Sequence, residues 1–319
     1  MTYVRREYPQ WSWSFSRQLT FDVYRRRYYY DHYASHNGWE QSAPEEAALK
    51  YRLKKLGNLY TALGDGVHRT AERIVRIVRR GGSIPSATAV EEMIREHLRN
   101  VWRSSRDQRD LFLTRPNRVP MLHEFYYGTG PSEEVVEKIN ARASQCGLAL
   151  AQALSLKELG GEETTIVGCE KFDTFELYDT PVYAVPDLLY YSKEEEWFIV
   201  DWKTGEQAPE DKEQVALYAL YVTEKYGIGA EKIKGRLEYL SSGTILETGF
   251  TEEKLQQVKE DAYRGMEQMQ SLLADRELNK AQPISQFPLT CERYRCNSCN
   301  FLELCGPELQ IEPRADVVS

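Results

Sequence analysis

Two carboxylates and an amine are expected to meet at one edge of a predicted β-sheet. A run rich in β-forming residues from 197 to 202 includes Asp201 and leads into Lys203; both point to the same face because side chains alternate along a strand. The preceding predicted strand contains Asp187, and a turn through residues 193–196 joins the two strands. Hard oxygen ligands favour Mg²⁺ or Mn²⁺, and an amine beside them can orient or deprotonate an attacking water. The segment therefore predicts a divalent-metal site.

A single Asp-x-Lys is also common on exposed strands that have no chemical function. The apolar neighbours Ile199, Val200 and Trp202 indicate instead that this strand lies in the protein interior. A buried carboxylate or ammonium group is costly unless it has a partner or a function. The surroundings of Asp201 and Lys203 therefore favour the functional interpretation.

Two pairs of polar residues at helical spacing can complete this site. His68 and Glu72 are four residues apart, so they lie on one face of a predicted helix, where His68 can supply a nitrogen ligand. Gln214 and Tyr218 have the same spacing in a later predicted helix, where they can contact a phosphodiester or hold Lys203. The alternatives are a surface histidine and an ordinary helix end.

Taken in order, these motifs resemble those of a known enzyme family. The order is Gly66-x-His68-x3-Glu72, Pro186-Asp187, Asp201-Trp202-Lys203-Thr204-Gly205 and Gln214-x3-Tyr218. In this order and spacing the chain resembles a RecB-like PD-(D/E)XK nuclease over roughly residues 12–305. The resemblance implies an α/β protein with a restriction-endonuclease-like mixed β-sheet core flanked by helices.

The resemblance also implies a role for each matched residue. The implied metal ligands are His68, Asp187, Asp201 and the backbone carbonyl of Trp202. The implied catalytic residues are Asp187, Asp201, Lys203, Gln214 and Tyr218. Lys203 would serve the attacking water, and the helix of Gln214 and Tyr218 would line the DNA channel. The implied reaction is hydrolysis of DNA phosphodiester bonds with Mg²⁺ or Mn²⁺. We expect an exonuclease that favours single-stranded DNA and acts in repair, recombination or CRISPR- and phage-related DNA processing.

Four of the six cysteines form a compact group near the C-terminus, which indicates a metal site. They are Cys291, Cys296, Cys299 and Cys305, all within 15 residues. Four thiolates suit either a [4Fe–4S] cluster or a tetrahedral Zn²⁺ ion. The last three resemble the C-terminal part of the iron–sulfur site in a RecB-like subgroup that includes CRISPR-associated exonucleases and helicase–nuclease subunits. The other two, Cys146 and Cys169, are expected in the core.

The chain departs from that subgroup near its N-terminus. The subgroup usually takes its first cluster cysteine from a segment like residues 14–30, where this chain has Val23-Tyr24. Cys291 is the obvious substitute as the fourth ligand. We therefore expect the four C-terminal cysteines to bind a [4Fe–4S] cluster, with Zn²⁺ as the alternative.

The N-terminal segment interleaves basic and aromatic residues, a mixture that suits binding of single-stranded nucleic acid. Arg25, Arg26 and Arg27 precede Tyr28 and further tyrosines, so cations for the phosphates stand beside rings that can stack on bases. The alternative is a helix that buries its tyrosines and exposes its arginines. Residues 1–120 contain 22 basic and 13 acidic residues and the remainder 19 and 36, although the net charge of the chain is −8. This asymmetry is a hint of a face that binds polyanions.

Hydrophobic periodicity and turn residues predict the elements that position these groups. Helical patterns cover residues 45–80, 87–111, 133–159, 212–226 and 252–278, and β-rich runs cover 164–169, 174–178, 181–191, 197–202, 234–239 and 244–249. This order predicts a mixed α/β fold with N-terminal helical additions and a C-terminal cysteine cluster. We expect a basic, DNA-contacting part at 1–160, a nuclease core at 161–280 and a cysteine segment with a tail at 281–319, all in one compact unit.

The composition is that of a soluble globular protein, with 41% hydrophobic and 28% charged residues. It excludes collagen-like, fully disordered and membrane-spanning chains, and the first residues lack the apolar core of a signal peptide. We expect a cytoplasmic protein that binds DNA and does not bind membranes. A helicase or a CRISPR integrase is a possible further partner, and the protein can form oligomers. The competing hypotheses are a non-cleaving DNA-binding or assembly subunit with a structural Fe–S or Zn site, and a zinc-stabilised scaffold with chance motifs.

Overall fold

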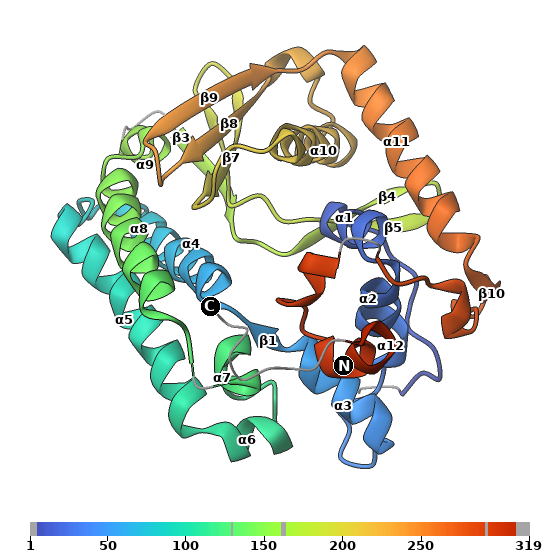
Figure 1. The fold of residues 1–319 in the computed structure, drawn as a ribbon. Coiled ribbons are helices and arrows are strands. Elements are labelled where there is room, and N and C mark those ends of the chain that lie inside the picture. The colour runs from blue at the N-terminus through green and yellow to red at the C-terminus, as the bar shows by residue number, and fades with distance from the viewer. Residues whose placement is uncertain (1–4, 129, 161–163, 291–292, 311–319) are drawn as a thin grey trace. The chain divides into compact units, whose positions relative to one another are not determined.

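The computed structural model describes residues 5–128, 130–160, 164–290 and 293–310, and the chain forms two compact units (Figure 1). Unit 1 comprises Met1–Leu59, Arg99–Val136 and Gly265–Ser319, and unit 2 comprises Tyr60–Leu98 and Glu137–Arg264. The boundaries fall within four long helices, α4 (Leu59–Val78), α5 (Ala87–Asp107), α8 (Glu133–Ala151) and α11 (Glu252–Gln270). The functional division expected at residues 160 and 280 stays a prediction.

Unit 2 is built on a mixed five-stranded sheet with the strand order β3–β6–β7–β8–β9. These strands are β3 (Thr164–Cys169), β6 (Leu188–Ser192), β7 (Trp197–Lys203), β8 (Ile233–Tyr239) and β9 (Thr244–Gly249). The pair β7–β8 is parallel, and the other neighbouring pairs are antiparallel. The mixed sheet confirms the predicted α/β class.

One predicted β-rich run, 181–191, is two strands in the structure. It divides into β5 (Thr180–Ala184), which forms a hairpin with β4 (Asp173–Leu177), and β6 of the main sheet. Pro186 lies in the break between them. Because proline has no N–H to donate to a neighbouring strand, it interrupts the ladder at this point.

The helix α10 (Pro209–Tyr226) connects the parallel strands β7 and β8 and packs against both of them (Figure 1). It approaches β8 closely because Gly235 has no side chain: a Cβ at this position would overlap Val215. The helix also contacts the β4–β5 hairpin, and residues 215–222 are all buried. A helix covered on all sides in this way is part of the core rather than of the surface.

The short helix α9 (Leu154–Glu158) contacts the other face of the sheet through polar groups. The carboxylate of Glu238 accepts hydrogen bonds from Ser155 N at 2.9 Å and from Trp202 Nε1 at 3.0 Å. Side chains alternate along β7, so the placement of the Trp202 ring on this face leaves Asp201 and Lys203 on the face of α10. The strand is buried on both sides, as its apolar residues predicted.

Unit 1 joins the first and last segments of the described chain around one apolar cluster. Its members include Tyr30, Phe112, Met121 and Phe301, which come from four separate segments. The elements are α1 (Phe15–Val23), α2 (Arg25–Tyr29), a π-helical turn η1 (Tyr30–Ala34), α3 (Glu45–Lys54), β1 (Leu56–Gly57), α6 (Arg109–Thr114), β2 (Met121–Leu122), α7 (His123–Tyr127), β10 (Leu273–Asp275), β11 (Lys280–Ala281) and α12 (Leu302–Leu309).

Three of the long helices predicted from periodicity are interrupted in the structure. The run 45–80 is α3 and α4 with β1 between them, 87–111 is α5 and the start of α6, and 133–159 is α8 and α9. The first interruption falls at Gly57, a residue with low helix propensity, and β1 pairs with β2 there. Within the described residues, none of the helices is both long and apolar enough to cross a membrane.

Candidate metal centre and active site

Three acidic residues stand in a row across three neighbouring strands of unit 2. The register of β6 with β7 pairs Leu188 with Val200, so the next position places Asp187 opposite Asp201. In the same way the register of β3 with β6 places Glu170 opposite Asp187, and the amide of Glu170 donates to the Asp187 carbonyl at 3.0 Å. Directly opposite side chains lie about 5 Å apart in antiparallel strands. The register therefore gathers three carboxylates at one place.

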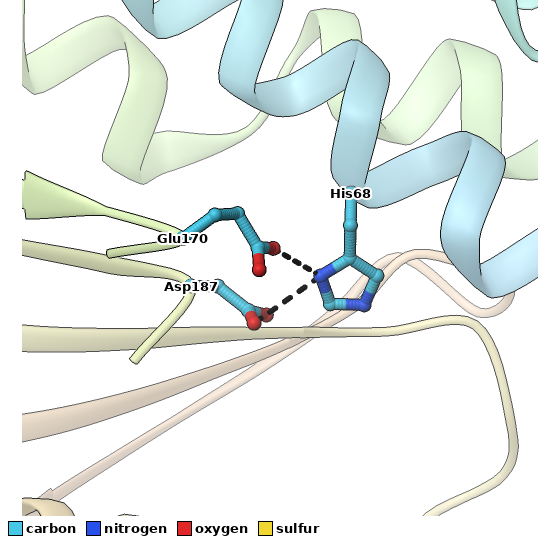
Figure 2. A group of neighbouring side chains, drawn as sticks. All are labelled: His68, Glu170 and Asp187. Atoms are coloured by element: carbon cyan, nitrogen blue, oxygen red, sulfur yellow. Dashed lines mark hydrogen bonds and ion pairs between the residues drawn. The ribbon is translucent and has the colours of Figure 1, made fainter. Parts of the chain in front are cut away.

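His68 of α4 reaches this row from outside the sheet (Figure 2). Its Nδ1 atom lies 2.6 Å from Glu170 Oε1 and 3.2 Å from Asp187 Oδ1. The possible ligand atoms of the three residues all lie within 4.8 Å of one another, so this group can hold a metal ion. The carboxylate oxygens suit Mg²⁺ or Mn²⁺, and the ring nitrogen is a further donor that a transition metal such as Mn²⁺ can use.

Burial and neighbouring charges shift the pKa values of the residues in and beside this group. Burial lowers the pKa of His68, but contacts with Asp187 and Glu170 outweigh that effect and raise it to about 11. Burial and the charge of Asp201 raise the pKa of Asp187 to about 7, and burial raises the pKa of Asp201. Both carboxyl shifts mean that the site favours an added positive charge. In this arrangement the His68 imidazolium supplies it.

The backbone of β7 orients Asp187. Its Oδ1 atom faces His68, while its Oδ2 atom accepts a hydrogen bond from the Trp202 amide at 2.6 Å. The N–H and C=O groups of one residue in a strand point to the same side, so the Trp202 carbonyl is also on the side of Asp187. The indole of Trp202 is fixed on the opposite face by Glu238. A rigid strand thus holds this carboxylate in place.

Lys203 is held by three oxygen atoms on the α10 side of the sheet. Its Nζ atom lies 2.8 Å from Asp201 Oδ2 and 3.3 Å from Asp211 Oδ1, and it donates to Gln214 Oε1 at 2.7 Å. Gln214 donates in turn from Nε2 to the Tyr218 hydroxyl at 2.9 Å. Burial lowers the pKa of Lys203, but Asp201 and Asp211 raise it above its ordinary value. The amine is therefore a fixed, protonated ammonium group.

The buried Oδ2 atom of Asp201 is compensated by an ion pair with Lys203. Among the described residues, Oδ2 accepts no well-aligned hydrogen bond, and its close partner is the ammonium group of Lys203 in an ion pair. A buried carboxylate oxygen is costly unless hydrogen bonds or cations compensate it. For Asp201 Oδ2, the ammonium group of Lys203 is that cation.

Sequence reasoning missed Glu170 and Asp211. Glu170 has a φ of 47°, a left-handed conformation that is uncommon for residues other than glycine and is found at functional sites. Only the register of β3 with β6 brings it to Asp187. Asp211 accepts from the Ala208 amide at 3.0 Å and from the Tyr239 hydroxyl at 2.8 Å, which fixes it beside Lys203. Its place in the first turn of a helix after Pro209 is a signal that could have found it.

The arginines and tyrosine expected to bind DNA have structural contacts in unit 1. Arg26 donates to the Phe287 carbonyl at 2.6 Å and pairs with Glu308, while Arg27 pairs with Asp31. The Arg25 guanidinium lies over the ring of Phe21. Tyr28 is fully buried and accepts a hydrogen bond from Arg17 at 2.9 Å. Because a buried ring cannot stack on a base, the expectation for Tyr28 is corrected: it belongs to the core of unit 1.

Three of the four clustered cysteines line one cavity of about 30 Å³ in unit 1. Cys296, Cys299 and Cys305 meet there with Tyr24 and Tyr30. Burial raises the pKa of Cys299, and it raises that of Cys305 to about 11. The three thiols share this cavity, but among the described residues they do not form a group whose ligand atoms all lie within 4.8 Å of one another.

The remaining cysteines differ in their positions. Cys291, the expected fourth ligand, lies outside the described residues. Cys146 is fully buried in α8, and Cys169 is half-buried at the end of β3. Tyr24, one of the two residues at the place where the resemblance implied a cluster cysteine, lines the same cavity as the three described thiols.

Comparison with known proteins agrees with this geometry. No curated protein matches the chain. A family profile described as the PD-(D/E)XK nuclease superfamily matches residues 12–306, nearly the whole chain. The mixed sheet with helices on both faces is consistent with the restriction-endonuclease-like fold of such nucleases. The order of motifs, the row of carboxylates with His68 and this match lead to one conclusion: the chain belongs to the PD-(D/E)XK nuclease superfamily.

Proposed function

We propose that this protein is a Mg²⁺- or Mn²⁺-dependent deoxyribonuclease of the RecB-like type. We propose further that it is an exonuclease favouring single-stranded DNA, in repair, recombination or CRISPR- and phage-related processing. The convergence of His68, Glu170 and Asp187 within 4.8 Å is the observation that carries the proposal. The ion pair of Asp201 and Lys203 on the neighbouring strand supports it, because metal-assisted hydrolysis needs a cation site beside a group that serves the nucleophile.

The metal would be bound by His68, Asp187, Asp201 and the Trp202 carbonyl, with Glu170 as an additional ligand. When bound, it would neutralise the scissile phosphate and stabilise the leaving oxygen. The buried carboxyl groups of Asp187 and Asp201 support this assignment, since their raised pKa values favour a cation. Trp202 contributes through its backbone, and its amide keeps Asp187 oriented.

Lys203 would serve the attacking water. As a protonated ammonium group it donates hydrogen bonds and offsets the negative charge that builds up on the phosphate. Gln214 holds the ammonium in place, and Tyr218 holds Gln214, so the three side chains act as one positioned unit. Gln214 and Tyr218 would thereby act at the channel that receives the DNA.

Exposed arginines on α4 support DNA as the substrate. Arg69, Arg73 and Arg76 are exposed along the helix that carries His68, and Arg79 and Arg80 follow at its end. Asp65 and Glu72 pair with Arg69 and Arg76, whereas within the described chain Arg73, Arg79 and Arg80 have no carboxylate partner. Free guanidinium groups on and just after the helix that carries His68 suit the phosphates of a nucleic acid.

The cysteine site would hold a [4Fe–4S] cluster, with Zn²⁺ as the alternative, through Cys291, Cys296, Cys299 and Cys305. The three thiols that line one cavity support it. A helicase or CRISPR integrase would be a partner of the nuclease. Absorption spectra of anaerobically purified protein distinguish the two metals, because only the iron–sulfur cluster absorbs broadly in the visible range.

The test of the nuclease function is cleavage of end-labelled single- and double-stranded DNA in Mg²⁺ or Mn²⁺. Asp201→Asn should lower the rate by about 10² to 10³-fold, since the carboxylate supports charge stabilisation in the transition state. Asp261→Asn, at an exposed position of α11, is the matched control and should keep full activity. Wild-type protein that binds but never cleaves DNA, or a fully active Asp201→Asn variant, would overturn the proposal in favour of a non-cleaving subunit.

A further inference from the structure

Two aromatic rings are exposed at the base of the β4–β5 hairpin in unit 2. The side chain of Phe172 is 69% exposed and that of Tyr183 is 36% exposed. Their ring centroids lie 4.9 Å apart with an interplanar angle of 43°. Single exposed apolar residues are ordinary on protein surfaces, but two aromatic rings in contact form a larger apolar surface that remains exposed to solvent.

This pair is tied by the chain to the candidate metal centre. Phe172 follows Glu170 by two residues, so their Cα atoms are at most about 7 Å apart. Tyr183 pairs with Thr174 in the hairpin and precedes Asp187 by four residues. Figure 2 shows Glu170 and Asp187 at the ends of adjacent strands, both turned toward His68. The two rings are therefore only two and four residues along the chain from Glu170 and Asp187.

Lys171 lies between Glu170 and Phe172 in the sequence. Lys171 is exposed, and its aliphatic stem lies over Gly168. A Cβ atom at residue 168 would come into contact with this stem. Packing of the stem fixes its course while the ammonium group remains in water. The sequence Glu170-Lys171-Phe172 thus places a metal ligand candidate, a phosphate-binding cation and an aromatic ring next to one another.

Aromatic faces beside cations are the chemistry by which proteins hold unpaired nucleotides. Every base offers a π-face, whereas a base inside a duplex is already stacked on its neighbours and is unavailable to a protein ring. We propose that Phe172 and Tyr183 form a stacking platform for one unpaired base beside the scissile phosphate, with Lys171 bound to a neighbouring phosphate. The inference rests on the proposed function and deepens it, because it names the feature that makes single-stranded DNA the preferred substrate.

The hairpin itself offers a matched control. At its turn, Tyr178 contacts Tyr263 with ring centroids 4.7 Å apart, and their exposed fractions are 47% and 44%. This second pair is similar in exposure but lies at the end of the hairpin away from the acidic row. Loss of the Tyr178 ring should not affect binding of an unpaired base.

The experiment measures binding of oligonucleotides in EDTA, so that it does not depend on cleavage. Phe172→Ala and Phe172→Leu should each weaken binding of single-stranded DNA by about 5- to 100-fold, and Tyr178→Ala by less than about twofold, from the usual worth of one base–ring stack. Affinity for blunt duplex DNA should stay unchanged. Thermal midpoints check that each variant is folded.

A series of abasic oligonucleotides identifies the stacked position. An abasic site at one position of the oligonucleotide should weaken its binding to the wild-type protein as much as the Phe172→Leu substitution does. The same abasic site should cause no further loss of affinity in the Phe172→Leu protein. Equal losses for single-stranded and duplex DNA, or an unchanged affinity in a folded Phe172→Leu protein, would overturn the platform. A wild-type protein that binds single strands through Phe172 but cleaves nothing would overturn the proposed function alone.

Discussion

At the scale of single residues, the candidate metal centre brings several negatively charged side chains close together. Glu170, Asp187 and Asp201 stand side by side in one row, with His68 and Lys203 as the nearest cations. The negative charges of Asp187 and Asp201 are stabilised only in part, as the raised pKa values of these two carboxyl groups indicate. Such crowding costs stability and is retained where a cation or a substrate is to be bound.

Asp187→Asn is predicted to stabilise the metal-free protein at alkaline pH while it impairs metal binding. The folded-state pKa of Asp187 is raised from 3.8 to about 7, so the folded protein holds this proton more tightly than the unfolded chain does. Wild-type stability contributed by this group is therefore lost as the pH rises from about 4 through 7. Asparagine stays neutral and still accepts from the Trp202 amide.

The measurement is the thermal midpoint in a chelator between pH 5 and pH 8. The midpoint of Asp187→Asn should exceed that of wild type by about 2 °C or more at pH 8, with a smaller gap at pH 5. Asp261→Asn should follow wild type at every pH. A gap that does not change with pH would contradict a raised pKa for Asp187.

At the scale of elements, each part of the site depends on one rigid segment. The strand β7 carries Asp201 and Lys203 on the face of α10 and anchors Trp202 on the other face. The helix α4 supplies His68, and its exposed side carries the arginines. An exposed arginine face on the same helix as a candidate metal ligand places phosphate-binding groups at a fixed distance from that ligand.

Replacing Arg73, Arg79 and Arg80 with glutamine is predicted to reduce the salt dependence of DNA binding. If each contacts one phosphate of a single strand, the slope of log K against log salt should fall in magnitude by about 2. The measurement is a titration of labelled single-stranded DNA in EDTA at several salt concentrations. As a control, replacing the exposed residues Lys157, Lys232 and Lys254 with glutamine also removes three positive charges, but it should leave the slope unchanged. Equal slopes for both triple variants would exclude α4 as the contact.

At the scale of the whole molecule, unit 1 gathers three stretches of chain that are distant in sequence. Its apolar cluster contains Tyr30 from the first stretch, Phe112 from the second and Cys305 from the third. Cys296 and Cys305 are thus part of the packing that joins these stretches. A metal bound there would add its binding free energy to the stability of unit 1.

Cys305→Ser is predicted to lose bound iron or zinc and to lower the thermal midpoint of the protein. The thiolate would be one of four ligands, and its loss would leave the site with three. The measurements are metal content per chain, the visible spectrum and the thermal midpoint. Cys146→Ala, a core substitution in unit 2, should keep the metal content of wild type even if it melts earlier. Unchanged metal content in Cys305→Ser would refute ligation by this cysteine.

The sequence alone was sufficient for the local features. The apolar neighbours of Asp201 and Lys203 predicted an interior strand, and β7 is buried. The four-residue spacing of Gln214 and Tyr218 predicted one helix face, and the contact between the two side chains agrees with this. These features depend on neighbours within a few residues, so periodicity is enough to find them.

The tertiary structure decided what depends on strand register and burial. The pairing of β3 with β6 brought Glu170 to Asp187, and no local pattern around Glu170 indicates that partner. Burial decided that Tyr28 belongs to a core and that Phe172 stays in water, although both are aromatic residues near charged ones. Register and burial are set by segments far apart in the chain, and a one-residue slip would move every side chain of a strand to the other face. The sequence therefore determined which groups are available for chemistry, and the packing of distant segments determined which of them meet.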